Sequence, residues 1–149
     1  MTLIAAFTGT DATALTSYTP DAGGSFTNHS SWASSSATIR TNRAAPGSSE
    51  SVVYHSGTVA DRTSASWSVS GALKYVASNS GSYGGLWAGV TGAKTGYVVY
   101  WYAGDWTLYK YSAGSGSSLG TYTSSVSVGD TNTIEIAFAA TQVLFKLNG

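Results

Sequence analysis

Short runs of β-branched and aromatic residues recur along this chain, and turn residues separate them. The separators are mostly Gly, Asn and Ser, and Gly and Asn accept the positive φ angles that tight turns often need. Runs that recur every ~8–12 residues between turn signals are typical of a β-sandwich. Helical periodicity is almost absent. The sequence therefore predicts an all-β domain in which two antiparallel sheets pack as a sandwich.

The expected strands follow these runs. They are Leu3–Phe7, Thr38–Asn42, Ser51–His55, Thr63–Val76, Leu86–Thr91, Tyr97–Tyr102, Trp106–Tyr111, Ser118–Thr123, Thr133–Ala139 and Val143–Leu147. The segment from Thr8 to Ser36 has the least regular pattern, and we expect a long loop there.

Composition narrows the class of protein. The 149 residues fit one domain spanning residues 1–149, and hydrophobic residues, at 42%, are sufficient for a core. Lys+Arg and Asp+Glu number 7 each, so no excess of positive charge favours a phosphate backbone, and we expect no nucleic-acid partner. No apolar run approaches the ~20 residues of a membrane helix, so no membrane insertion is expected. The lack of cysteine excludes disulfides and thiolate metal sites.

The balance of polar residues bears on location. Ser, Thr, Gly and Tyr are abundant and Lys and Glu are scarce, as is usual for secreted or particle-exposed β proteins. Met1–Phe7 does not match a signal peptide, because it lacks a basic start and its apolar stretch is shorter than ~7–15 residues. We therefore expect an extracellular or virion-surface location, reached after removal of a signal, as part of a larger exported chain, or by release of a virion on lysis.

The clearest local pattern is a hairpin between Gly96 and Tyr111. If Ala103-Gly104 is its two-residue turn, Trp101 lies opposite Trp106. Side chains alternate between the two faces of a strand. The face that we expect to point into the core carries Val99, Trp101, Trp106 and Leu108. The other face carries Val98, Tyr100, Tyr102, Tyr109 and Tyr111.

Three stretches together resemble the concanavalin A-like lectin/glucanase superfamily, and its laminin-G-like branch in particular. They are Phe7–Asp11 with Leu15 and Thr19–Gly24, then Gly85–Val90 with Gly96-Tyr97 and Leu108–Lys110, and finally Gly129–Ile136 leading into Val143–Gly149. The resemblance covers nearly the whole chain in order and spacing. It implies a jelly-roll sandwich of two antiparallel sheets.

The end of the chain departs from that family. Domains of this kind continue past such an Asn-Gly turn into a further strand, so we expect that the closing strand is lacking from residues 1–149 or comes from a neighbouring subunit. The alternative is a frayed end at Asn148-Gly149. Val143–Leu147 is expected to pair with Thr133–Ala139, and its outer edge to be covered by Leu3–Phe7, by another subunit or by residues absent from this sequence.

Catalytic patterns are missing. The glucanases of the family carry two glutamates and an aspartate at alternate positions of one strand, and a retaining mechanism needs carboxyls about 5–5.5 Å apart. Here the only glutamates, Glu50 and Glu135, are far apart in sequence. Neither of the two histidines, His29 and His55, is accompanied by a Gly-x-Ser-x-Gly elbow between an expected strand and an expected helix. We therefore expect no enzyme, with a glycoside hydrolase as the weakest of three hypotheses.

Some laminin-G-like domains bind calcium on the rim through Asp or Asn side chains. The corresponding candidates here are Asp11, Asp21 and Asn28. The alternative, which we favour, is that Asp11 and Asp21 are turn and cap residues that bond their own backbone. No other cofactor is expected.

Carbohydrate binding needs aromatic planes for the C–H faces of sugars and polar groups for their hydroxyls. The candidates are Trp87, Tyr100, Tyr102, Asp105, Trp106, Tyr109 and Tyr111. Aromatic residues are also the largest side chains available to fill a core, and we expect at least half of these six aromatics to be buried.

Two hypotheses for function remain. The first is a non-catalytic lectin-like domain for attachment or surface display, with a glycan as its partner. The second is a structural or decoration protein of a phage or virus particle, in which the same fold packs against copies of itself or other virion subunits. The aromatic hairpin favours the first, and the absence of an export signal and of disulfides favours the second.

Overall fold

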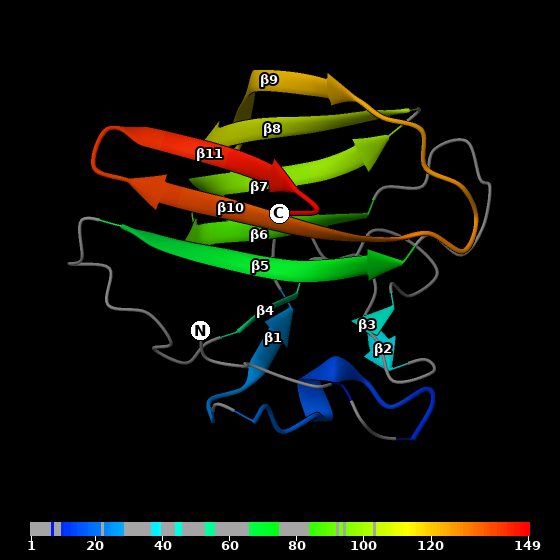
Figure 1. Ribbon diagram of the computed structural model, residues 1–149. Coiled ribbons are helices and arrows are strands. Elements are labelled where there is room, and N and C mark those ends of the chain that lie inside the picture. The colour runs from blue at the N-terminus through cyan, green and yellow to red at the C-terminus, as the bar shows by residue number, and fades with distance from the viewer. Residues whose placement is uncertain are drawn as a thin grey trace. The chain divides into compact units, whose positions relative to one another are not determined.

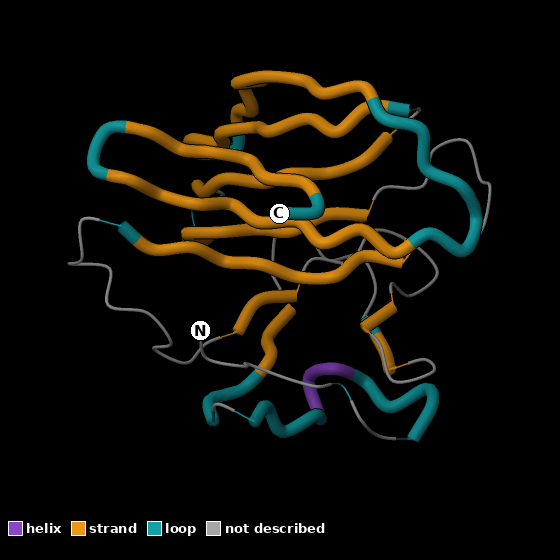
Figure 2. The backbone as a smooth tube through the Cα atoms, in the orientation of Figure 1, coloured by secondary structure: helices purple, strands orange, loops and turns teal. Residues whose placement is uncertain are grey.

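The computed structural model describes residues 7, 10–21, 23–28, 37–39, 44–45, 53–55, 66–74, 84–91, 93, 95–102 and 104–149. The chain divides into two compact units, residues 1–61 and 62–149. Strands make up most of the second unit (Figures 1 and 2), and the helical element among the described residues is the 3-10 turn η1 at Leu15–Ser17. No helix in this described part is long and apolar enough to cross a membrane.

The first unit consists of short elements. β1 (Phe26–Asn28) pairs antiparallel with β4 (Val53–His55), and β2 (Thr38–Ile39) pairs antiparallel with β3 (Ala44–Ala45). Leu15 and Ala37 are buried in a small cluster that also contains Phe7, Tyr18 and Phe26. The long loop expected between Thr8 and Ser36 is therefore wrong at β1, because β4, distant in sequence, supplies a pairing partner. Of the expected strand Leu3–Phe7 only Phe7 is described, and it is not in a strand.

The second unit is a two-sheet antiparallel sandwich, which confirms the predicted fold class. One sheet has the order β11-β10-β5 and the other β6-β7-β8-β9, and Figure 1 shows the two as separate layers. The strands are β5 (Trp67–Lys74), β6 (Gly84–Thr91), β7 (Thr95–Tyr102), β8 (Asp105–Ser112), β9 (Ser115–Thr123), β10 (Thr131–Ala139) and β11 (Gln142–Leu147).

The β7–β8 hairpin has the register that the alternation predicted. In β7–β8, Trp101 lies opposite Trp106 and Val99 opposite Leu108. β10 pairs with β11 as expected, with Ile136 opposite Phe145. The β8–β9 turn is shorter than predicted, so β9 begins at Ser115 rather than Ser118. The reason is that Ala113 and Gly114 both have positive φ, at 49° and 89°, which makes a two-residue turn sufficient.

The end of the last strand is held to β10. Asn148 has a φ of 58°, a left-handed conformation that Asn tolerates better than most residues. Its backbone N–H donates to the Thr133 carbonyl at 2.8 Å, and its Oδ1 accepts from the Thr133 N–H at 2.9 Å. The alternative of a frayed end is therefore wrong at Asn148.

The core lies between the two sheets. Val99, Trp106 and Leu108 come from one sheet, and Ile134 and Ile136 from the other, and all five are buried. β5 contacts β6, and β10 contacts β6 and β7, while Phe145 of β11 reaches Trp106 of β8 at a ring-centroid distance of 6.0 Å. The three-stranded sheet has no fourth strand to pack against β9, and all nine residues of β9 are exposed.

Candidate functional site

A row of aromatic rings lies on the face of the four-stranded sheet that points away from the core. Because Val99 and Trp106 point inward, alternation places the residues next to them in sequence on the outer face. The ring-bearing residues there that contact one another are Trp87 of β6, Tyr100 of β7, and Tyr109 and Tyr111 of β8. We call these four residues the aromatic row.

The four rings form a chain of contacts in which each ring lies next to the following one. The Trp87 and Tyr111 ring centroids are 5.3 Å apart, those of Tyr111 and Tyr109 are 6.2 Å apart, and those of Tyr109 and Tyr100 are 5.3 Å apart. Rings at 4.5–7 Å attract one another beyond the effect of area burial. All four residues are half-buried. The row is therefore a surface held in place by mutual contacts.

The rings of the row lie close to the backbone of the sheet. Val98, which is opposite both Trp87 and Tyr109 in the register, is only 2% exposed although it points outward. At Gly116 of β9, a Cβ atom would lie 2.8 Å from the Tyr111 ring. Tyr111 therefore lies directly over the β9 backbone, and a glycine makes this approach feasible.

Polar groups border the row on the side of the β7–β8 turn. The Thr107 and Thr121 hydroxyl oxygens are 3.4 Å apart, and Thr123 Oγ1 donates to Asp105 Oδ1 at 2.7 Å. Tyr102, opposite Asp105, is 40% exposed. Among the described residues, Asp105 is the one charged residue on this outer face. The face thus combines aromatic planes with hydroxyls and a single carboxylate.

Trp106, also a candidate from sequence, lies in the core instead. It is 2% exposed, since its position in β8 is one residue away from the outward-pointing Asp105 and Thr107. Its buried indole Nε1 has no hydrogen-bond partner among the described residues. Of the six aromatic candidates only Trp106 is buried, so the expectation that at least half would be is wrong. Four of the outward-pointing aromatic residues instead form the aromatic row, and Tyr102 is exposed on the same face.

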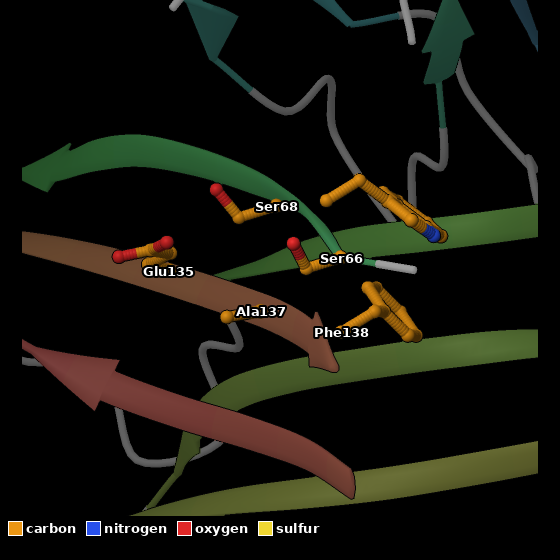
Figure 3. A pocket seen from close by; sticks show the side chains of 6 residues that line it. Ser66, Ser68, Glu135, Ala137 and Phe138 are labelled. Atoms are coloured by element: carbon orange, nitrogen blue, oxygen red, sulfur yellow. The ribbon is translucent and has the colours of Figure 1, made fainter. Parts of the chain in front are cut away.

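A recess also lies in the three-stranded sheet (Figure 3). It is a shallow pocket of about 230 Å³ lined by Ser66, Trp67, Ser68, Glu135, Ala137 and Phe138. Hydrogen bonds from Ser68 and from Lys146 lower the pKa of Glu135 below its ordinary value of 4.5, and partial desolvation opposes them. The Lys146 Nζ lies 3.2 Å from Glu135 Oε2.

Glu135 has no second carboxylate among the residues that line this pocket. Glu50, the other glutamate, falls outside the described residues. Sequence patterns did not identify Ser68 as a partner of Glu135, because only the strand order places β5 next to β10. The expected pairing of Thr133–Ala139 with Val143–Leu147 carried no register, so it did not place Lys146 opposite Glu135. With Lys146 directly opposite it, Glu135 is part of a cross-strand ion pair.

The calcium candidates lie in the first unit. Asp11 and Asp21 are exposed, and Asn28 is in β1 opposite Val53. Within the described ranges, no three His, Asp or Glu side chains are close enough to share a metal ion. Calcium binding therefore stays a prediction of the sequence.

Comparisons of the chain with protein-family models, with curated proteins and with solved structures gave no match.

Proposed function

We propose that the outer face of the four-stranded sheet binds carbohydrate, and that the chain is a non-catalytic lectin-like domain for attachment or surface display. The observation that supports this most strongly is the aromatic row. Its rings contact one another over three strands, from Trp87 to Tyr100, and they are half-buried rather than enclosed in the core.

The chemistry of the face suits sugars. The C–H face of a pyranose packs on an aromatic plane, and its hydroxyls need hydrogen-bond partners at the edge of that plane. The tyrosine hydroxyls, Thr107, Thr121 and Asp105 supply such groups beside the row. Because Asp105 is the one charge on the face among the described residues, we expect a neutral glycan rather than an acidic one.

This face suits the binding of a glycan without its hydrolysis. A glycosidase needs two carboxyl groups on either side of the scissile bond. Among the residues described, the outer face offers one carboxylate, that of Asp105, and it accepts a hydrogen bond from Thr123. A sugar on the aromatic row would therefore meet no acid–base pair there.

A second candidate function is that of a structural or decoration protein on a virus particle. The observation that favours it is β9, a complete strand at a sheet edge that is exposed along its whole length. Such an edge suits packing between subunits. The two functions are compatible, because the edge of β9 and the aromatic row are different surfaces.

A glycan array followed by titration calorimetry tests the leading proposal. We expect neutral glycans among the hits, and a loss of about 30-fold in affinity for Tyr109→Ala, which corresponds to ~2 kcal/mol at a binding hot spot. Leu144→Ala is the matched control, since Leu144 is also apolar and 43% exposed but lies on the other sheet. An array without hits, or equal losses in both variants, would contradict the proposal.

A further inference from the structure

The most exposed strand of the sandwich is β9, at the edge of the four-stranded sheet. No strand of the three-stranded sheet covers it, and every residue from Ser115 to Thr123 is exposed. On the side away from β8, its backbone N–H and C=O groups face no other described strand. An edge of this kind is a template for pairing with another chain.

We propose that two copies of this chain pair through β9, antiparallel and edge to edge, so that their four-stranded sheets form one continuous sheet. Each copy then supplies the strand that the other lacks at this edge. This proposal is independent of carbohydrate binding, because it concerns the edge of the sheet and not its outer face.

The composition of β9 favours an identical partner. A two-fold axis pairs a strand with an identical strand, so both carry the same charges. Like charges directly opposite each other destabilise a strand pair. Ser115–Thr123 contains no charged residue and no proline, and the net charge of the chain is zero. Self-pairing of β9 therefore meets no electrostatic opposition.

The edge of the other sheet on this side is different. β11 carries Lys146, whose ammonium group pairs with Glu135 across the strands at 3.2 Å. Lysine on an edge strand is one of the usual devices that prevent edge-to-edge pairing. Charge thus protects β11 but not β9, and this contrast directs the proposed contact to β9.

The pairing is expected in the second half of β9. The register changes between Leu108, which is opposite Gly120, and Tyr109, which is opposite Ser118, so Leu119 is an extra residue in a bulge. The bulge interrupts the edge there and leaves Gly120–Thr123 as a regular segment. Leu119 and Tyr122, which are 51% and 57% exposed, would lose contact with water when the sheet continues into the second copy.

The pairing has a geometric consequence. An antiparallel continuation of a sheet keeps the outer faces of both halves on the same side. The aromatic rows of the two copies would therefore lie on one face of an eight-stranded sheet. Two glycan sites side by side would raise avidity, and this consequence alone depends on the proposed function.

The test is the oligomeric state of the full chain without glycan, measured by sedimentation and light scattering over about a hundredfold range of concentration. We expect a dimer that the double variant Leu119→Lys/Tyr122→Lys reduces to a monomer. The control Leu144→Lys adds the same charge at an exposed apolar residue of the other sheet and is expected to leave the dimer intact. A chain that is monomeric throughout, or a dimer that survives the double variant, overturns the proposal.

A second measurement guards against a double variant that fails to fold. In the unchanged chain, hydrogen exchange of the outward backbone amides of Gly120–Thr123 is expected to slow as concentration rises, while the amides of the β10–β11 turn at Ala140-Thr141 keep their rate. Exchange in β9 that does not depend on concentration overturns the proposal.

Discussion

The rings of Tyr100 and Tyr109 stack with their centroids 5.3 Å apart and their planes at 14°, although the two residues are not directly opposite. Tyr100 is opposite Thr107, and Tyr109 is opposite Val98, so the contact runs diagonally across the β7–β8 pair. Diagonal neighbours are within reach of aromatic side chains. This stacked pair joins the rings of β7 to those of β8 and gives the outer face its continuous aromatic surface.

Gly116→Ala is expected to weaken glycan binding with little change in stability. The new Cβ would lie 2.8 to 2.9 Å from atoms of the Tyr111 ring, which must swing away and so break the row at its centre. Because the ring is the far end of a side chain, the free energy of unfolding should fall by less than about 1 kcal/mol. Calorimetry and chemical denaturation measure the two effects.

Gly120→Ala is the matched control for that experiment. It lies in the same strand, and a Cβ there would meet no atom within 4 Å. Affinity and stability should both stay near those of the unchanged chain. Equal effects of the two substitutions on affinity would show that the position of the Tyr111 ring does not matter.

Trp106→Phe is expected to destabilise the protein far less than Trp106→Ala. The smaller ring keeps part of the core contact with Phe145 and removes a buried N–H that lacks a partner among the described residues, whose desolvation costs about 1–3 kcal/mol. Alanine leaves a cavity, with a loss of about 3–5 kcal/mol. Urea denaturation gives both values, and similar losses would show that the indole N–H is satisfied.

Glu135→Gln is expected to reduce the dependence of stability on acid pH. The pKa of Glu135 is lowered in the folded chain, first by the Ser68 hydrogen bond and then by Lys146. The carboxylate therefore contributes stability at pH values above its ordinary pKa of 4.5, and this contribution is lost as the pH falls through the folded pKa. The difference in urea midpoint between the two proteins should shrink from about pH 6 to about pH 3. A difference that stays constant over this range would contradict the assigned shift.

Asn148→Ala is expected to lower the free energy of unfolding by about 1–2 kcal/mol. Alanine loses the side-chain bonds to the Thr133 N–H and to Asn132, and it is strained at a φ of 58°. Asn148→Gly separates the two causes, since glycine loses the bonds but accepts the angle. A thermal denaturation series in which both variants match the unchanged chain would show that the β10–β11 end is not held by Asn148.

Local patterns predicted the architecture of the second unit well. The alternation of Val99, Trp101, Trp106 and Leu108 assigned the buried face and the register of β7–β8 without any knowledge of the rest of the chain. Two-residue periodicity and a short turn determine such a hairpin almost completely. The same reasoning predicted the pairing of β10 with β11.

Contacts between residues distant in sequence were beyond that reasoning. β1 is a strand because β4 pairs with it, and nothing in Phe26–Asn28 alone indicates this. The diagonal contact of Trp87 with Tyr111 depends on the order of three strands, and the Ser68 bond to Glu135 depends on β5 lying next to β10. The residue type also does not show whether a tryptophan lies on the surface or in the core. Trp87 and Trp106 have the same side chain, and only their positions in the strand alternation place Trp87 on the outer face and Trp106 in the core.

These two tryptophans provide the most direct measurement of the central claim. In a two-dimensional ¹⁵N NMR spectrum, each indole N–H gives its own signal, and a neutral glycan selected by the array is added to saturation. The Trp87 signal, at one end of the aromatic row, and the amides of Tyr100, Tyr109 and Tyr111 are predicted to shift, while the signal of the buried Trp106 stays close to its position. Shifts confined to the pocket around Ser68 and Glu135, or none outside the first unit, would contradict the account.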